Sequence, residues 1–483
     1  MANNAQAGQN PAATSPPAPP SVLLKLTHGF GAAAFGIKNN GFDYFLLLFY
    51  GTVVGLEPGL VGLAILIALV FDAFSDPLVG YWSDNLRSRW GRRHPFMYAA
   101  ALPVGLSYFL LWNPPELSQL GLFLYLTILA VLIRTFITFY ETPSTALLPE
   151  LSRDYDERTS LQSYRIFFGW CGGNMMSILM FGFILTGPLG LRDRAGFETY
   201  GIIAGVILFA AIVVSTIGTH HRIPTLTVPP KRTKPFSLKL VFGEIFETLN
   251  ERSFIALFAA TVLFSVATGL GASLAFLMLN HFWGFSEGQI FIWTTLVFVS
   301  AGISFVIAPM ATKRWGKKRA TIILGLFAFT VQPAPYLLRL AGLMPENGDP
   351  LLFPLIVAIN TLDLAFIIAV QTVSYAMIAD LVESNQVKTG RRNEGVYYAA
   401  ITFTRKATQG LGVLAAGLIL SAVAFPDAAE PGTVADDTLW SLGALYAPTL
   451  LVIYLAALYF VSRYKIDKAQ HEANLELLSQ RGS

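Results

Sequence analysis

Apolar runs of about twenty residues recur along the whole chain. Each run is long enough to cross a hydrocarbon layer of about 30 Å as a helix. The 483 residues are 54% hydrophobic and only 13% charged, whereas a soluble protein is about 25% charged. Continuous runs also argue against a β-barrel, whose strands alternate over about ten residues. The chain is therefore predicted to be an all-α membrane protein.

We expect twelve transmembrane helices, with a long connection between the sixth and the seventh. They fall near 25–53, 58–83, 95–113, 118–148, 164–187, 199–217, 253–280, 287–312, 319–341, 351–382, 397–423 and 441–463. The predicted units are a disordered tail at 1–22, a six-helix half at 23–217, a linker at 218–252, a second six-helix half at 253–463 and a tail at 464–483. The linker segment FSLKLVFGEIFETLNE has an apolar stripe that suits a helix on the membrane surface or a plain linker helix.

Basic residues gather in the connections after the even-numbered spans. Four arginines follow the second span and five basic residues follow the eighth, whereas the last odd-numbered connection, PDAAEPGTVADD, is acidic. Basic loops stay on the cytoplasmic side of a membrane. We therefore expect a multi-pass protein of the cell (inner) membrane with both termini, the linker and both tails in the cytoplasm.

A short internal repeat relates the two halves. RWGRR at 89–93 follows the second span, and RWGKK at 314–318 follows the eighth. These positions correspond in the two sets of six spans. Duplicated halves are typical of transporters that bind substrate between them, near the middle of the bilayer.

Two aspartates, Asp72 and Asp76, interrupt the apolar second span one helical turn apart, so they share a face. Each costs about 2.5–3.5 kcal/mol at the centre of a bilayer. A carboxylate pair assisted by the hydroxyl groups of Ser75 and Thr138 could bind Na⁺, with Asp72 and Asp76 as metal ligands, or a proton. We expect these four residues to form a cation site.

Other charges lie within the predicted spans. Glu141 follows Thr138 by one turn, Arg165 begins the fifth span, and Lys406, in the eleventh, is a candidate counter-ion for the carboxylate pair. Lys38, Asp43, Arg134 and Asp363 are also intramembrane, and they suit either a structural charge network or a functional one.

The segment GYWSDNLRSRWGRR combines Gly80, Asp84 and clustered arginines that include Arg92 and Arg93. Arginines there can close onto carboxylates and helix ends at the cytoplasmic face. The segment resembles the helix 2–3 loop motif of the major facilitator superfamily. We expect Asp84, Arg92 and Arg93 to form a gate, and a loop that only sets orientation is the alternative.

Several stretches resemble the glycoside–pentoside–hexuronide:cation symporters, a family that includes the melibiose permease. They are FDAFSDPLVGYWSD, RSRWGRRHPFM, YETPSTALLPEL and IADLVESNQVKTGRRNEGVYYAAITFTRKATQG. The resemblance runs from about Gly29 to the end of the eleventh span. It implies the major facilitator fold, with two pseudo-symmetric six-helix halves. It also implies symport of a sugar or glycoside-like substrate with Na⁺ or H⁺ by alternating access.

The resemblance also implies roles for single residues. The family's cation site is similar to Asp72, Ser75, Asp76 and Thr138, and Lys406 matches a lysine beside it that couples cation to substrate. Glu141 and Arg165 match sugar-binding residues. The family's helix 1 aspartate falls near Gly36, and its two stacking tryptophans fall at Thr145 and near Gln371. The predicted substrate-binding residues are Glu141, Arg165, Lys38, Asn39, Thr145, Gln371 and Thr402.

Other function classes find little support in the sequence. A net charge of +3 and a single cysteine imply no nucleic-acid partner and no cysteine metal site. Nucleotide-binding and hydrolase motifs are missing, so we predict a transporter, not an enzyme, with no cofactor beyond its coupling cation. It would work as a monomer in the lipid bilayer on a small-molecule substrate. One alternative substrate is a lysolipid or another amphipathic or anionic molecule. A non-transporting sensor or scaffold is a further alternative, and it predicts unchanged flux in Asp72→Asn.

Overall fold

A computed structural model describes residues 19–152, 155–187, 189–226, 252–389, 394–426, 429, 432–465 and 477. Of these, the side chains at 149, 155–156, 158–159, 252, 375–376, 378–386, 388–389 and 394–407 are outside the description. The segment predicted as a surface helix, 236–251, and most of both tails lie outside the described residues.

The described chain is helical throughout, and the bounds of its elements follow. The first half contains α1 (Val22–Phe30), α2 (Ala32–Asn40), η1 (Gly41–Phe45), α3 (Leu46–Leu48), η2 (Phe49–Val54), α4 (Pro58–Asn85), α5 (His94–Leu111), α6 (Gln119–Leu151), α7 (Tyr155–Leu179), η3 (Met180–Ile184), η4 (Gly190–Arg192), α8 (Arg194–His220) and η5 (Ile223–Thr225). The second half contains α10 (Arg252–Leu277), η6 (Met278–Phe282), α11 (Glu287–Val331), α12 (Ala334–Leu340), α13 (Leu352–Thr389), α14 (Glu394–Ala422) and α15 (Asp436–Ser462).

Each predicted span falls on helix, and the all-α membrane prediction is confirmed. Within the described ranges, nine helices are long and apolar enough to cross a membrane. The longest of them contains the predicted spans 287–312 and 319–341, separated by the non-helical residue Gly316. The first span differs from the prediction, because α-helical pieces alternate in it with the π-helical segments η1 and η2. The ninth breaks before Ala334, where two prolines follow Gln332 closely.

The repeated RWG sequence has the same backbone shape in both halves. Gly91 has φ 72° and Gly316 has φ 74°. A residue with a Cβ pays roughly 1–2 kcal/mol in this left-handed region, and glycine does not. The glycine at the third position of each repeat therefore lets the chain turn between two spans.

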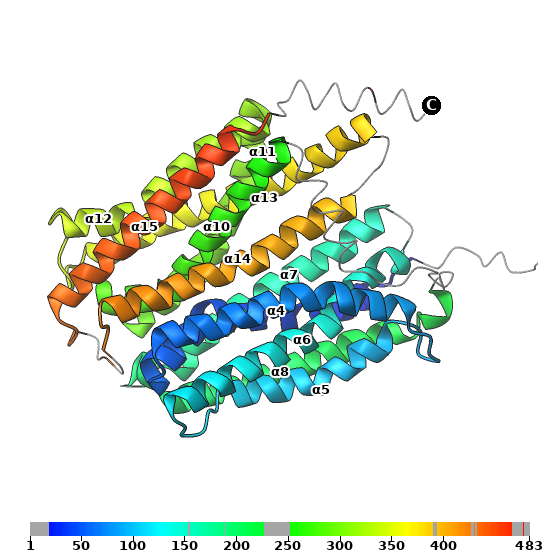
Figure 1. The fold of residues 1–483 in the computed structure, drawn as a ribbon, viewed down its shortest axis with the longest axis horizontal. Helices are drawn as coiled ribbons and strands as arrows, with labels where there is room; N and C mark the ends of the chain where they lie inside the picture. The colour runs from blue at the N-terminus through cyan, green and yellow to red at the C-terminus, as the bar shows by residue number, and fades with distance from the viewer. Residues whose placement is uncertain are drawn as a thin grey trace, which may run out of the picture.

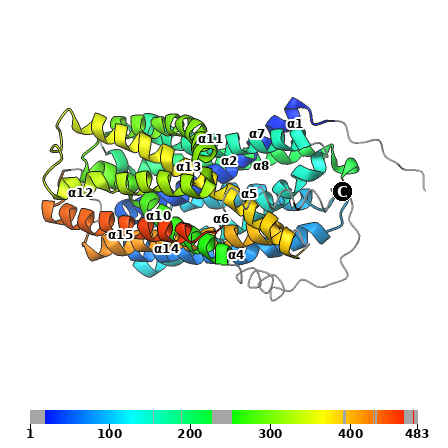
Figure 2. The same ribbon diagram turned by 90° about the horizontal axis from the view of Figure 1, so that it is seen from above.

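The two halves lie side by side along their length (Figures 1 and 2). The blue-to-cyan helices of the first half meet the green-to-red helices of the second, and α4 packs against α14. Glycine permits the closest approach: a Cβ on Gly417 of α14 would lie 2.2 Å from the carbonyl oxygen of Pro58 on α4. Backbone therefore touches backbone where the halves meet.

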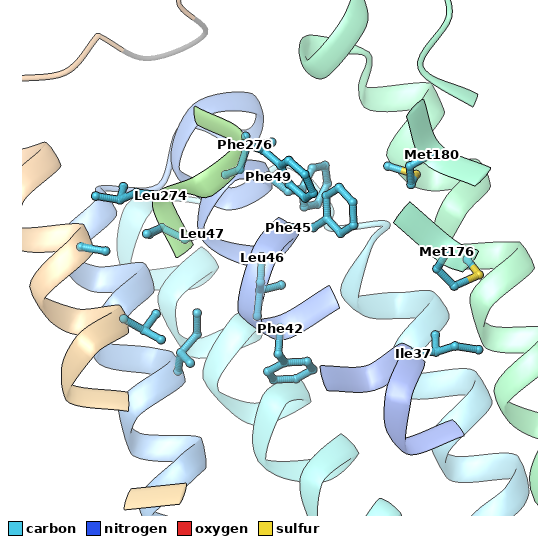
Figure 3. Packing of buried hydrophobic residues seen from close by; sticks show 14 of the residues in the cluster. Ile37, Phe42, Phe45, Leu46, Leu47, Phe49, Met176, Met180, Leu274 and Phe276 are labelled. Carbon is cyan, nitrogen blue, oxygen red and sulfur yellow. The ribbon is translucent and has the colours of Figure 1, made fainter. Parts of the chain in front are cut away.

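Phe45, Phe181 and Phe276 form an aromatic seal between the halves. The ring centroids of Phe45 and Phe276 are 5.0 Å apart, and those of Phe181 and Phe276 are 4.6 Å apart. Figure 3 shows Phe45 and Phe276 lying together beside Phe49. All three seal residues are buried, and they lie toward the ends of their spans that face the odd-numbered connections. The seal therefore closes the space between the halves at that end.

Candidate functional site

The carboxylates of α4 meet a hydroxyl group of α6. Thr138 Oγ1 lies 2.9 Å from Asp72 Oδ1 and 2.8 Å from Asp76 Oδ1, both within hydrogen-bond distance. One helical turn separates the two aspartates, so a single residue of the facing helix reaches both. Asp72 and Thr138 are almost completely buried, with 1% and 2% of their surfaces exposed. The structure therefore brings together three of the four residues predicted to bind a cation.

Ser75 lies next to this cluster but makes a different contact. Its hydroxyl group donates a hydrogen bond to the main-chain carbonyl of Asp72 over 3.1 Å. Serine commonly bonds back to its own helix in this way. The hydroxyl group of Ser75 is thus engaged by the backbone of α4.

Arg134 is a member of the cluster that the sequence did not assign to it. Its Nη1 donates to Asp72 Oδ2 over 3.3 Å, and its guanidinium lies 4.8 Å from the centre of the Phe42 ring. Only 3% of Arg134 is exposed. The signal was present in the sequence, since Arg134 precedes Thr138 by one turn and so points to the same side of α6. One carboxylate of the pair therefore already has a protein cation beside it.

A cavity of about 660 Å³ lies between the halves. Its lining includes residues predicted to bind substrate, namely Lys38, Asn39, Glu141, Arg165 and Gln371, as well as Arg134 and Asp363. Binding sites for small molecules typically have volumes of about 300–1,000 Å³. The cavity thus has the size of a small-molecule site, and Arg134 both lines it and contacts Asp72.

Arg165 of α7 is held in a fixed position on the wall of the first half. Its two terminal nitrogens donate to Ser144 Oγ and Thr145 Oγ1, each over 2.7 Å, and Glu141 Oε1 lies 4.0 Å from Nη2. Thr145, where the family carries a stacking tryptophan, therefore positions the guanidinium. Ser144 was not expected here, although its place one residue before Thr145 was visible in the sequence.

Lys38 and Asn39 lie on α2 and line the same cavity. Lys38 Nζ donates to Asn39 Oδ1 over 2.6 Å and lies 4.8 Å from the centre of the Phe35 ring. Only 1% of Lys38 is exposed. Gln371 contributes to the wall from α13. Thr402 and Lys406 fall on α14, but their side chains lie outside the described residues.

The wall contains tryptophans at positions that the sequence comparison with the family did not indicate. Trp170, Trp283 and Trp293 all line the cavity. They come from α7, the end of η6 and α11. Since an aromatic face can stack on the apolar face of a sugar ring, the loss of tryptophan at Thr145 and Gln371 does not remove this chemistry from the cavity.

The predicted gate residues assemble around one more acid, Glu150, at the end of α6. Arg93 Nη2 lies 3.3 Å from Asp84 Oδ1 and 2.9 Å from Glu150 Oε1, and Arg92 forms an ion pair with Glu150. Burial lowers the pKa of Arg93 from its ordinary value, while Glu150 and Asp84 counteract this shift. The cluster ties the loop between α4 and α5 to the end of α6. Glu150 was not predicted, because its partner Arg92 lies 58 residues away in the sequence.

Relatives that align over most of this chain are named as symporters or transporters. The inner membrane symporter YicJ of Escherichia coli is 26% identical, over 92% of this chain and 92% of its own. The isoprimeverose transporter of Lactiplantibacillus pentosus is also 26% identical, over 78% and 75%. A sodium-dependent lysophosphatidylcholine symporter of Gallus gallus is 22% identical, over 95% and 89%.

Solved structures share the fold at low sequence identity. A point mutant of the nucleoside transporter NupG superposes with a TM-score of 0.63 at 14% identity, covering 92% of this chain and 99% of its own. A bacterial homologue of the iron transporter ferroportin, in an inward-facing state, gives 0.62 at 13% identity, covering 92% and 100%. The sequence model of the MFS/sugar transport protein family matches residues 27–468. The chain therefore belongs to this family of major facilitator symporters, as its resemblance to the glycoside–pentoside–hexuronide:cation symporters predicted.

Proposed function

We propose that this chain couples the movement of a cation to the uptake of a sugar or glycoside. One observation carries the proposal: the cluster of Asp72, Asp76 and Thr138 adjoins, through Arg134, a cavity lined by both halves. Symport requires a cation site that adjoins a substrate site between two rocking halves. The names of the related proteins, an inner membrane symporter and an isoprimeverose transporter among them, agree with this function.

The substrate site opens alternately to the two sides of the cell membrane. By the positive-inside rule, the basic loops favour a cytoplasmic position for the termini and for the Asp84–Arg92–Arg93–Glu150 cluster. The aromatic seal then closes the outer side, and the cavity of this conformation serves the inward-facing part of the cycle. Substrate uptake requires that the seal separates, so that the same cavity opens outward.

A proton is the coupling cation that fits the cluster best. A hydroxyl group carries one hydrogen, so Thr138 cannot donate fully to Asp72 and Asp76 at once. A proton on Asp76 resolves the conflict: the acid donates to Thr138 Oγ1, and Thr138 donates to Asp72. Two neighbouring carboxylates favour such a shared proton because their charges repel.

Arg134 adds a second argument for a proton. A sodium ion requires several oxygen ligands, but the guanidinium of Arg134 engages Asp72 Oδ2, and the hydroxyl of Ser75 is engaged by the backbone. The arginine also repels a second cation at short range. The charge that a metal ion would supply to Asp72 is therefore supplied by the protein.

In the substrate site, Arg165 presents a fixed guanidinium to hydroxyl groups, with Glu141 as a hydrogen-bond acceptor beside it. Lys38 and Asn39 complete this wall. Paired donors and acceptors in fixed positions suit neighbouring hydroxyl groups of a sugar ring.

Uptake into proteoliposomes tests the proposal. A panel of sugars, aryl glycosides and lysophosphatidylcholine is offered under an imposed proton gradient, under a sodium gradient at constant pH, and without a gradient. We expect a glycoside to accumulate only with the proton gradient, and Asp76→Asn to bind substrate without accumulating it. Accumulation driven by sodium alone would contradict the proton assignment, and uptake of the lysolipid alone would contradict the sugar assignment.

A further inference from the structure

The second half contributes a buried carboxylate to the cavity wall, Asp363 on α13. Only 1% of this residue is exposed, and Oδ1 has no hydrogen-bond partner among the described residues. Burying a polar group without a partner costs roughly 1–3 kcal/mol, and more for a charged one. The cation cluster on the first half does not use this acid, so its cost requires another explanation.

Two further polar atoms of the second half are in the same state. Gln332 Oε1 and Trp293 Nε1 are buried without a hydrogen-bond partner within the described part of the chain, and both residues line the cavity with Asp363. The carboxylate and the amide oxygen accept hydrogen bonds, whereas the indole nitrogen donates one. This wall therefore offers two acceptors and one donor.

Aromatic rings line the same cavity as these atoms. Tyr336 packs edge-on against Tyr446 at 5.3 Å between ring centroids and lies tilted against Trp283 at 5.2 Å, and all three line the cavity. Gly271 of α10 leaves the space open, since a Cβ there would lie 3.7 Å from Gln332 Nε2 and 3.8 Å from the hydroxyl oxygen of Tyr446. This part of the cavity is therefore lined by both polar atoms and aromatic rings.

We propose that Asp363, Gln332, Trp293 and Tyr336 form a second sugar subsite that binds the far unit of a two-unit glycoside. This proposal rests on the proposed transport function. Two hydroxyl groups of that unit donate to Asp363 and Gln332, Trp293 donates to a ring or glycosidic oxygen, and Tyr336 contacts the apolar face of the ring. Arg165 and Glu141 bind the near unit from the first half.

The size and position of the cavity support a substrate of two units. A volume of about 660 Å³ lies well inside the range for ligands of drug size, and polar groups occur on walls from both halves. A ligand that contacts both halves binds more tightly in one arrangement of the halves than in another, which is the condition for driving a conformational change. A single sugar that contacts only the first half does not gain this difference in affinity between the two arrangements.

Paired substrates test the subsite. Binding of the disaccharides melibiose (galactosyl-glucose) and isoprimeverose (xylosyl-glucose) is compared with binding of galactose and xylose, for the wild type, Asp363→Asn and Gln332→Leu. The exposed acid Asp349, which accepts a hydrogen bond from the backbone amide of Leu351, gives the control Asp349→Asn. Size-exclusion profiles and melting temperatures in detergent identify variants that do not fold.

For a folded Asp363→Asn or Gln332→Leu, we expect the Kd of the preferred disaccharide to rise about tenfold, which corresponds to about 1.4 kcal/mol. The Kd of the free sugar should change less than about twofold, which is below 0.5 kcal/mol, and Asp349→Asn should resemble the wild type. Equal losses for glycoside and free sugar, or no loss in folded variants, would overturn the subsite while leaving sugar transport standing. A wild type that binds none of the four compounds would instead contradict the proposed function.

Discussion

Arg134 changes how the carboxylate pair must be understood at the scale of single residues. An aspartate in a membrane helix predicts a bound ion or a partner, and here Asp72 has a partner in its own protein at 3.3 Å. Breaking a buried ion pair by removing one member costs about 3–5 kcal/mol. The pair is therefore a structural contact, and under our proposal it also determines which cation can bind.

Removing the guanidinium should admit sodium to the cluster. We expect Arg134→Ala to accumulate substrate under a sodium gradient at constant pH, because the guanidinium charge 3.3 Å from Asp72 is then removed. Arg134→Lys keeps a positive charge and serves as the matched control, which should remain indifferent to sodium. Initial rates of uptake measure the effect, and a folded Arg134→Ala that ignores sodium would refute this account.

The hydroxyl group of Thr138 should be essential to coupling. Thr138→Val keeps the shape of the side chain but removes hydrogen bonds to charged groups, each worth about 1.5–3 kcal/mol. We expect proton-driven accumulation to fall about tenfold or more, whereas Thr138→Ser should retain it. Substrate-induced pH change outside proteoliposomes reports the coupling, and equal behaviour of the valine and serine variants would argue against it.

The cation cluster was predictable where it depends on helical periodicity. Asp72 and Asp76 share a face because they are four residues apart, and Thr138 offers a hydroxyl group within an apolar span. Arg134 was assigned no place there, because the sequence does not tell which of several acids a buried arginine meets. Glu150 and the polar atoms around Asp363 were missed for the same reason: their neighbours are set by packing between helices far apart in the sequence.

At the scale of elements, the two RWG turns decide where spans end. α11 would run straight through 314–318 if Gly316 kept helical angles, and its φ of 74° separates two spans instead. The sequence predicted both spans from hydropathy, and the repeat predicted equivalent turns. The π-helical segments of the first span were not predicted, since a single extra residue in a helical turn leaves no hydropathy signal.

A Cβ at the turn should destabilise the protein. We expect Gly316→Ala to lower the stability by roughly 1–2 kcal/mol, because alanine tolerates the left-handed region poorly. Gly302 lies in the same helix with open space around its Cβ position, so Gly302→Ala should be neutral or slightly stabilising. Melting temperatures in detergent compare the two, and equal values would show that the turn carries no strain penalty.

At the scale of the whole molecule, the halves meet through backbone contact at α4 and α14 and through the aromatic seal. The major facilitator fold with two halves was predicted from hydropathy, loop charge, the repeat and the family resemblance. The sequence did not predict which end is closed, because that depends on which side chains of different spans meet. The seal residues Phe45, Phe181 and Phe276 are three of 37 phenylalanines.

Adding a methyl group between the halves should shift the conformational balance outward. The Cβ of Gly417→Ala would collide with the Pro58 carbonyl, 2.2 Å away, and so disfavours the closed outer end. In a Cys171→Ser background, we expect a cysteine placed at Ala275 in the cavity to react faster with a membrane-impermeant maleimide added outside. Gly302→Ala is the control, and unchanged reactivity in Gly417→Ala would show that this contact does not hold the end shut.

The single hydrogen of Thr138 has a consequence for the cell. If the cluster takes up one proton for each substrate molecule, the energy available to concentrate the sugar is that of one proton moving down its electrochemical gradient. A driving force of about 100 mV supplies about 2.3 kcal/mol, which limits the ratio of inner to outer sugar concentration to roughly 50-fold. Such a carrier suits an environment where the sugar is moderately abundant, and it exports its cargo once the internal pool exceeds that ratio.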